Sequence, residues 1–151
     1  MRIALASDHA GFLLKKGIAA YLKEKSIAFE DFGCDSEDRV DYVDFGQKAA
    51  EAVVGGQCDR AILICGTGLG MAIVANKFKG VRATPCADMY VAEMSRAHND
   101  SNCLTLGGRV TPLDEALEIV DIWLGTPFDS SRHGRRVEKI QKIEDRNFKP
   151  I

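Results

Sequence analysis

The 151-residue sequence has no apolar run long enough to cross a membrane, since a spanning helix needs about 20 consecutive apolar residues. Residues 1–6 have the pattern of a strand and not the layout of a signal peptide. The five cysteines are odd in number, widely spaced and never arranged as C-x-x-C, which argues against a disulfide framework or a zinc site. We therefore expect a protein of the reducing cytoplasm, with no membrane partner.

Two common nucleotide-binding signatures are also missing. The glycine-rich segment 66–70 is followed by Met71 where the dinucleotide fingerprint G-x-G-x-x-G requires a glycine, and no Lys-Ser or Lys-Thr pair follows as in a P-loop. Residues 131–151 carry seven basic and three acidic residues, a balance that can indicate nucleic acid or simply a solvated helix face. Aromatic side chains that could stack on bases are scarce there, which counts against nucleic acid.

Short apolar segments alternate with helical patterns along the whole chain. Strands are expected at residues 3–7, 27–32, 61–65, 81–84 and 103–106. Helices are expected at residues 11–25, 41–54, 69–78 and 88–97, from a capping signature at Thr111-Pro112 to Gly125, and at about 131–147. This alternation predicts a single α/β domain over residues 1–151, a three-layer α/β/α sandwich around a five-stranded parallel Rossmann-like sheet.

The most informative segment is the glycine loop that follows Cys65. A buried strand leads into Gly66-Thr67-Gly68-Leu69-Gly70, and a helix follows. Unpaired amides at a helix start can hold an oxyanion and favour the thiolate form of a nearby cysteine. Cys65 is therefore a candidate base or nucleophile, the alternative being a tight turn with no chemistry. Asp8-His9 and Gly107-Gly108-Arg109 follow other strands, so all three clusters are expected at the ligand-binding edge of the sheet.

Other residues admit weaker interpretations. Arg132 and Arg136 lie four apart on one helix face, where they could grip a phosphate group or simply face solvent. His98 closes a helix, and His133 is expected to be solvated. Cys103 and Arg109 have the C-x5-R spacing of thiol phosphatases, but residues 104–106 alternate like a strand where that chemistry needs a loop. Cys34, Cys58 and Cys86 are expected to serve packing alone.

Six motifs occur in order along nearly the whole chain, and together they resemble ribose-5-phosphate isomerase type B, in the family that also holds galactose-6-phosphate and allose-6-phosphate isomerases. The motifs are Ser7-Asp8-His9-Ala10-Gly11, Cys65-Gly66-Thr67-Gly68-Leu69-Gly70-Met71, Ala75-Asn76-Lys77, His98-Asn99-Asp100, Leu106-Gly107-Gly108-Arg109-Val110 and Arg132-His133-Gly134-Arg135-Arg136-Val137. One branch of the family has Ser and Glu at positions 65 and 71. This chain has Cys and Met, and so resembles the cysteine branch.

The resemblance implies an aldose–ketose isomerase that interconverts ribose 5-phosphate and ribulose 5-phosphate through a cis-enediol, without metal or organic cofactor. It implies that Cys65 is the base, that His98 with Asp8 opens the furanose ring, and that Thr67 assists ring opening or passes a proton between the two oxygens. The implied binding residues are Gly66, Thr67, Gly68, Leu69 and Gly70 as the anion hole, His9, Arg109, Arg132 and Arg136 on the phosphate, and Asn99 and Tyr42 on the sugar.

In this family the two halves of each site come from different subunits. The resemblance therefore implies a homodimer or tetramer in which Asp8, His9, Cys65 and Thr67 face a partner's set of His98, Asn99, Arg109, Arg132 and Arg136. The helix at about 131–147 would reach the partner, a role that needs no nucleic acid. Two alternative functions stay open: an isomerase of a hexose 6-phosphate, and a non-catalytic module that binds a phosphosugar or nucleotide. The number of subunits, two or four, stays open as well.

Overall fold

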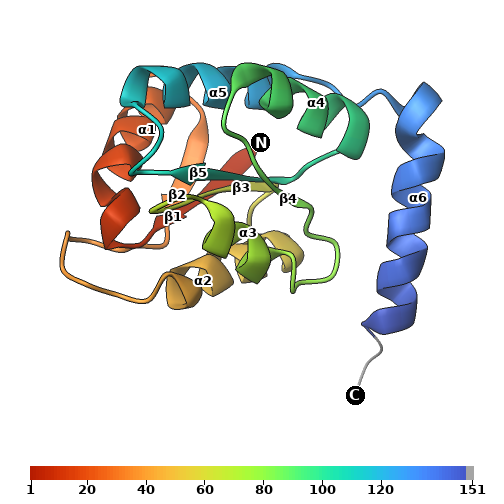
Figure 1. Cartoon of the computed structure of the whole chain (residues 1–151), viewed down its shortest axis with the longest axis horizontal. Coiled ribbons are helices and arrows are strands. Elements are labelled where there is room, and N and C mark those ends of the chain that lie inside the picture. The colour runs from red at the N-terminus through yellow and green to blue at the C-terminus, as the bar shows by residue number, and fades with distance from the viewer. Residues whose placement is uncertain (149–151) are drawn as a thin grey trace.

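The computed structural model describes residues 1–148, in which five parallel strands form one sheet with helices on both faces (Figure 1). The strands are β1 (Arg2–Ser7), β2 (Ala28–Asp31), β3 (Arg60–Cys65), β4 (Ala83–Pro85) and β5 (Cys103–Gly107). The helices are η1 (His9–Gly11), α1 (Phe12–Glu24), α2 (Tyr42–Val54), α3 (Leu69–Ala75), α4 (Met89–Asn99), α5 (Leu113–Gly125) and α6 (Ser130–Asn147). The predicted three-layer α/β sandwich is confirmed. Lys149, counted above in the basic tail, lies outside the described residues.

The strand order is β2-β1-β3-β5-β4. From β1 the chain first adds β2 on one side and later adds β3 on the other, so the direction of winding reverses between β1 and β3. A crevice opens at the carboxyl ends of the strands where such a reversal occurs. Ser7 is level with Ile64, and Cys65 is level with Gly107. The loops after β1, β3 and β5 therefore leave the sheet side by side.

Side chains of different size cover the two faces of the sheet. Ile3 and Leu5 point into the layer under α1 and α5, which also contains Trp123. The alternate residues of β1, Ala4 and Ala6, point toward α2 and α3, and that second layer is rich in alanine. Small side chains let helices approach a sheet closely. At Gly46 of α2 a Cβ would lie 2.8 Å from the sulfur of Met71, so α2 also packs tightly against α3. This face holds α3, and with it the glycine loop, close to the sheet.

Two elements differ from their predicted bounds for visible reasons. α3 ends at Ala75 and β4 starts at Ala83, because the Asn76 side chain exchanges two hydrogen bonds with the backbone of Ala83, at 2.8 and 2.9 Å. The carboxamide thus takes the place of a neighbouring strand. Pro112 precedes α5 instead of starting it, and no side chain caps this helix. Acidic residues in its first turn complement the helix dipole instead.

Candidate active site

Three loops converge beside Cys65 at the carboxyl edge of the sheet. The Asp8 amide donates to the carbonyl of Ile64 at 3.1 Å, and the Gly108 amide donates to the carbonyl of Cys65 at 2.7 Å. A Cβ at Gly108 would lie 2.3 Å from the carbonyl oxygen of Ala10, so only glycine lets the outer two loops meet. The predicted gathering of polar clusters at this edge is therefore observed.

The sulfur of Cys65 lies inside the turn made by the glycine loop. The Gly68 amide donates to Sγ at 3.2 Å, and Cys65 as a residue is 5% exposed. Gly68 has φ of +81°, which glycine adopts without strain, and it caps α3 from outside the helix. The hydroxyl of Thr67 accepts from the Leu69 amide at 3.4 Å. An N–H donor beside the sulfur is complementary to a thiolate.

Asp8 and His9 are each fixed by a backbone amide. The buried Asp8 carboxylate accepts from the Gly11 amide at 3.0 Å and caps η1. The Nδ1 atom of His9 accepts from the Val40 amide at 3.2 Å. A neutral imidazole that accepts at Nδ1 carries its proton at Nε2. His9 can therefore donate from Nε2 to an anion.

Tyr42 and Arg109 flank the glycine loop. A Cβ at Gly70 would lie 2.7 Å from Cε2 of the Tyr42 ring, and one at Gly66 would lie 3.4 Å from Nη1 of Arg109. The Arg109 amide also donates to the carbonyl of Gly66 at 3.0 Å. Arg109 was expected in the partner's set, but the structure places it against the glycine loop of its own chain. It belongs to the loop of its own chain, because β5 pairs directly with β3.

A second group of expected site residues lies at the junction of α4 and α6. The rings of His98 and His133 stack with centroids 3.9 Å apart. Nη1 of Arg136 lies 3.2 Å from Nδ1 of His133. His133 was expected to be solvated, but it is buried here. This burial, followed by the charges of His98 and Arg136, lowers the pKa of His133.

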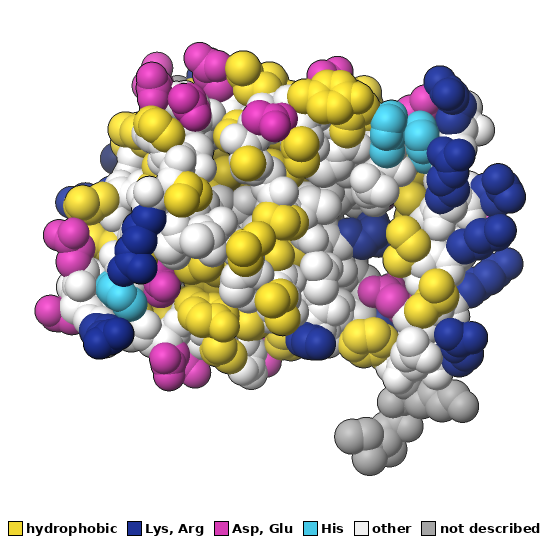
Figure 2. Space-filling model, viewed as in Figure 1, with side chains coloured by type: hydrophobic (Ala, Val, Ile, Leu, Met, Phe, Trp, Pro, Cys, Tyr) yellow, Lys and Arg dark blue, Asp and Glu magenta, His cyan; other side chains and the backbone are white. Residues whose placement is uncertain are grey.

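The two groups are separate within one chain. Figure 2 shows a pair of histidines beside α6 and a single histidine on the opposite side of the same face. Among residues 1–148 no hydrogen bond or ion pair joins the glycine loop to His98, Asn99, Arg132 or Arg136. Asn99 lines a cavity of about 360 Å³ between α6 and the β4 edge, together with Ile140 and Phe148.

The remaining cysteines lie away from the loop. Cys103 begins β5 and is fully buried, which raises its pKa strongly, and Arg109 lies beyond the other end of that strand. The phosphatase interpretation is therefore excluded. Cys34, Cys58 and Cys86 are free and buried, as expected for packing. Within residues 1–148, no three side chains of His, Cys, Asp or Glu cluster as a metal site would require. None of the helices there has the length and apolar character for crossing a membrane.

The family model described as Ribose/Galactose Isomerase matches residues 3–140. Ribose-5-phosphate isomerase B of Escherichia coli K12 is 48% identical over 145 residues, which span 96% of this chain and 97% of that protein. The chain belongs to the ribose/galactose isomerase family. It is therefore an isomerase by descent, and its fold matches solved members of this family closely.

Two solved ribose/galactose isomerases illustrate the structural match. Ribose-5-phosphate isomerase B of Clostridium thermocellum superposes with a TM-score of 0.94 at 53% identity, covering 97% of this chain and 99% of that one. The Mycoplasma genitalium enzyme, solved with bound ribulose 5-phosphate, superposes with a TM-score of 0.90 at 39% identity, covering 95% of each chain. The likeness thus extends over nearly the whole chain.

Proposed function

We propose that this chain interconverts D-ribose 5-phosphate and D-ribulose 5-phosphate, with Cys65 as the base. The observation that carries the proposal is the Cys65 sulfur held 3.2 Å from the Gly68 amide inside a glycine loop at the ligand-binding edge of the sheet. The Escherichia coli relative has this activity in its name, and the Mycoplasma genitalium relative was solved with the ketose product.

The reaction moves one proton between neighbouring carbons. The Cys65 thiolate removes the proton from C2 of the open-chain aldose, and charge develops on the carbonyl oxygen of a cis-enediolate. The same sulfur returns the proton to C1, while the Thr67 hydroxyl passes a proton from O2 to O1, so the atoms balance. The amides of residues 66–70 stabilise the developing charge, and losing one such donor typically costs about 3–4 kcal/mol in an oxyanion hole.

The other residues bind the sugar and prepare it for this step. His98, with Asp8, opens the furanose ring, and Asn99 and Tyr42 contact the sugar. The phosphate is held by His9, Arg109, Arg132 and Arg136. His9 suits this role because its Nε2–H is free to donate. The phosphate lies far from the reacting carbons, so its binding energy serves to position them.

We further propose that each site is completed by a second copy of the chain, in a homodimer or a dimer of dimers. The separation of His98, Asn99, Arg132 and Arg136 from the glycine loop supports this assembly. Apolar side chains on α3 and at the start of α4 support it too, with Leu69, Ile73 and Tyr90 between 57% and 69% exposed. A reducing cytoplasm would preserve the five free cysteines, including the base.

Replacing the base tests the proposal. In Cys65→Ala we expect the turnover number for ribose 5-phosphate to fall about 10²- to 10⁴-fold, the usual contribution of a general base, with little change in KM. Cys58→Ala, at another buried cysteine, is the control for a lost thiol. Unchanged turnover in Cys65→Ala would remove Cys65 from the mechanism.

Ring opening can be measured separately from proton transfer. Ribulose 5-phosphate cannot close a furanose ring because its O5 carries the phosphate, so exchange of its C1 proton with heavy water needs the base but no ring opening. In His98→Asn we expect loss of ribose 5-phosphate turnover with this exchange retained. Loss of both in equal measure would contradict the role given to His98.

Two alternatives are distinguished by the same enzyme preparation. A hexose 6-phosphate substrate would appear as faster turnover of allose or galactose 6-phosphate than of ribose 5-phosphate. A non-catalytic binding module would be stabilised by the phosphosugar without forming product. The pentose is favoured because the Escherichia coli, Clostridium thermocellum and Mycoplasma genitalium relatives are each named ribose-5-phosphate isomerase B.

A further inference from the structure

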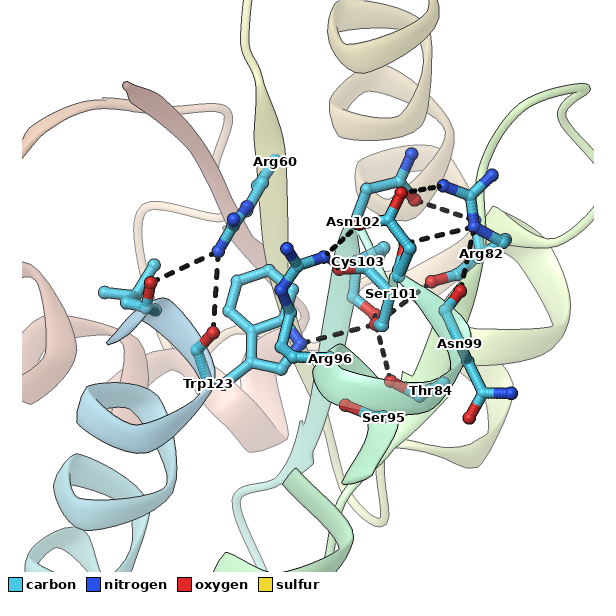
Figure 3. A network of polar contacts seen from close by, with 12 residues as sticks. Arg60, Arg82, Thr84, Ser95, Arg96, Asn99, Ser101, Asn102, Cys103 and Trp123 are labelled. Atoms are coloured by element: carbon cyan, nitrogen blue, oxygen red, sulfur yellow. Dashed lines mark hydrogen bonds and ion pairs between the residues drawn. The ribbon is translucent and has the colours of Figure 1, made fainter. Parts of the chain in front are cut away.

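The end of α4 is held by a network of arginine contacts that the reaction above does not use (Figure 3). His98 and Asn99 are the last two residues of this helix, and Asp100 follows in a left-handed conformation with φ of +47°. Such a conformation persists only when its surroundings fix it. What fixes Asp100 therefore also fixes the two residues before it.

Two guanidinium groups form hydrogen bonds to this turn. Arg96 donates to Oδ1 of Asp100 at 2.8 Å, and Arg82 donates to Oδ2 at 3.0 Å. Nε of Arg82 also donates to the carbonyls of Asn99 and Asp100, at 3.1 and 3.0 Å, and Arg96 donates to the carbonyl of Ser101 at 2.5 Å. Three consecutive carbonyls of the turn are thus bound, together with both carboxylate oxygens.

The residues of this network also bond to the sheet and to the buried core. Arg82 directly precedes β4, and its amide donates to Oδ1 of Asn102 at 2.7 Å. The Ser101 hydroxyl bonds Thr84 at 2.7 Å and accepts from the buried Trp123 indole at 3.3 Å. The side chain of Arg96 is 6% exposed, so its charge relies on Asp100 and Ser101. The network therefore fixes the turn to β4 and α5.

The hydrogen bonds of the two arginines reach the backbone near His98 and Asn99 and the side chain of Asp100. Asn99 is held by its backbone carbonyl, while its side chain points away from Arg82 (Figure 3) and lines the cavity next to α6. His98 stacks on His133 of α6. We infer that Arg82 and Arg96, acting through Asp100, are positioning residues that aim His98 and Asn99 at the sugar. The inference rests on the proposed function.

Arg82→Gln is the main test, because it removes three of the contacts and leaves the buried Arg96 paired. We expect turnover of ribose 5-phosphate to fall about 10- to 100-fold, the scale of a small misplacement of reacting groups. Exchange at C1 of ribulose 5-phosphate should fall much less than turnover, since Cys65 lies outside the network and exchange depends on the turn only through the sugar contact of Asn99. In a His98→Asn background, Arg82→Gln should cause little further loss, because both changes act on one step.

Arg2→Gln is the matched control, since Arg2 forms an exposed ion pair with Glu30 at 2.8 Å. Asp100→Asn is a second variant that preserves size and tolerates the left-handed backbone. Arg82→Lys should rescue turnover poorly, because one ammonium group cannot reproduce the planar fork. Equal loss of turnover and exchange in Arg82→Gln would show general damage and overturn the inference, as would full turnover.

A second readout does not depend on activity. The imidazole NMR signals of His98 and His133 should shift in Arg82→Gln and stay unchanged in Arg2→Gln, because only the first change releases the turn. Unshifted signals would overturn the inference even if the protein had no measurable turnover. If the wild-type protein isomerised no sugar phosphate, but Arg82→Gln still shifted these signals, the result would contradict the proposed function alone.

Discussion

Gly108 shows how one missing side chain shapes the site. Its Cβ position lies 2.3 Å from the carbonyl oxygen of Ala10 and 3.0 Å from Cα of Gly11. These are backbone atoms and cannot rotate aside. The loop that carries Arg109 can therefore touch the loop that carries Asp8 and His9 only if position 108 has no side chain.

We expect Gly108→Ala to cost about 1–3 kcal/mol of unfolding free energy, the usual range for overpacking, and to lower kcat/KM for ribose 5-phosphate by separating the two loops. Urea unfolding and steady-state kinetics measure the two effects. Gly125→Ala is the control, because nothing lies within 4 Å of its Cβ position. Equal stability of the two variants would contradict the close contact.

The sequence was most informative about residues whose role follows from local structure. Cys65 was identified from a strand, a glycine loop and a helix in succession, and that order alone places its sulfur among amides. His133 was missed because its burial depends on α6 packing against α4. No apolar stripe marks this side of α6, because Val137 is the one large apolar residue among those that face inward in the described part of the helix.

At the scale of elements, α6 is attached to the rest of the molecule by few contacts. The Asp129 amide donates to the carbonyl of Ala97 at 2.9 Å, His133 stacks on His98, and Lys79 pairs with Asp145 at 2.8 Å. Ile143 remains 51% exposed. Figure 1 shows the helix standing beside the sandwich instead of covering the sheet. Its docking should therefore respond to the charge of His133, which is buried in this contact.

We expect the docking of α6 to weaken in acid. The pKa of His133 lies below its ordinary value of 6.5, lowered by burial and by the charges of His98, Arg136 and Arg132, against the opposing charge of Asp129. Detached α6 then binds a proton more readily than docked α6, so stability present above about pH 6.5 is lost as the pH falls. Hydrogen exchange of the α6 amides between pH 7.5 and 5.5 measures this, both ends chosen to bracket about 6.5.

His133→Phe is the matched variant, since it keeps an aromatic ring against His98 and removes the titration. In this variant, the protection of the α6 amides from hydrogen exchange should decrease less as the pH falls than it does in the wild-type protein. An identical pH dependence of α6 protection in both proteins would show that another group controls the docking. The comparison needs no catalytic activity, so it remains valid whatever the substrate is.

At the scale of the whole molecule, the proposed site needs two chains, and its halves can be supplied separately. Cys65→Ala and His98→Asn should each be inactive alone. In a two-fold dimer, a mixed pair contains one intact site, so random mixing should restore about a quarter of wild-type turnover. Turnover after mixing and refolding the two variants measures this. If each site lay within one chain, every mixture would stay inactive.

The order of the strands could not be predicted from the sequence. Alternating strands and helices predict a parallel sheet, but each strand carries the same apolar signal and none identifies its neighbours. The winding reversal between β1 and β3, which opens the crevice, depends on tertiary packing. The division of the site into two groups came from the family resemblance, and only the structure showed that Arg109 belongs with the glycine loop.

The alanine-rich layer beneath α2 and α3 has a consequence for how such an enzyme can diverge. Ala4, Ala6 and Ala72 are buried together in the layer between α3 and the strands. A bulkier residue at any of them would lift α3 and tilt the amides beside Cys65, although these side chains are buried in the interior. New substrate preferences can therefore arise from changes hidden in the interior, and a search for them should include this layer as well as the pocket walls.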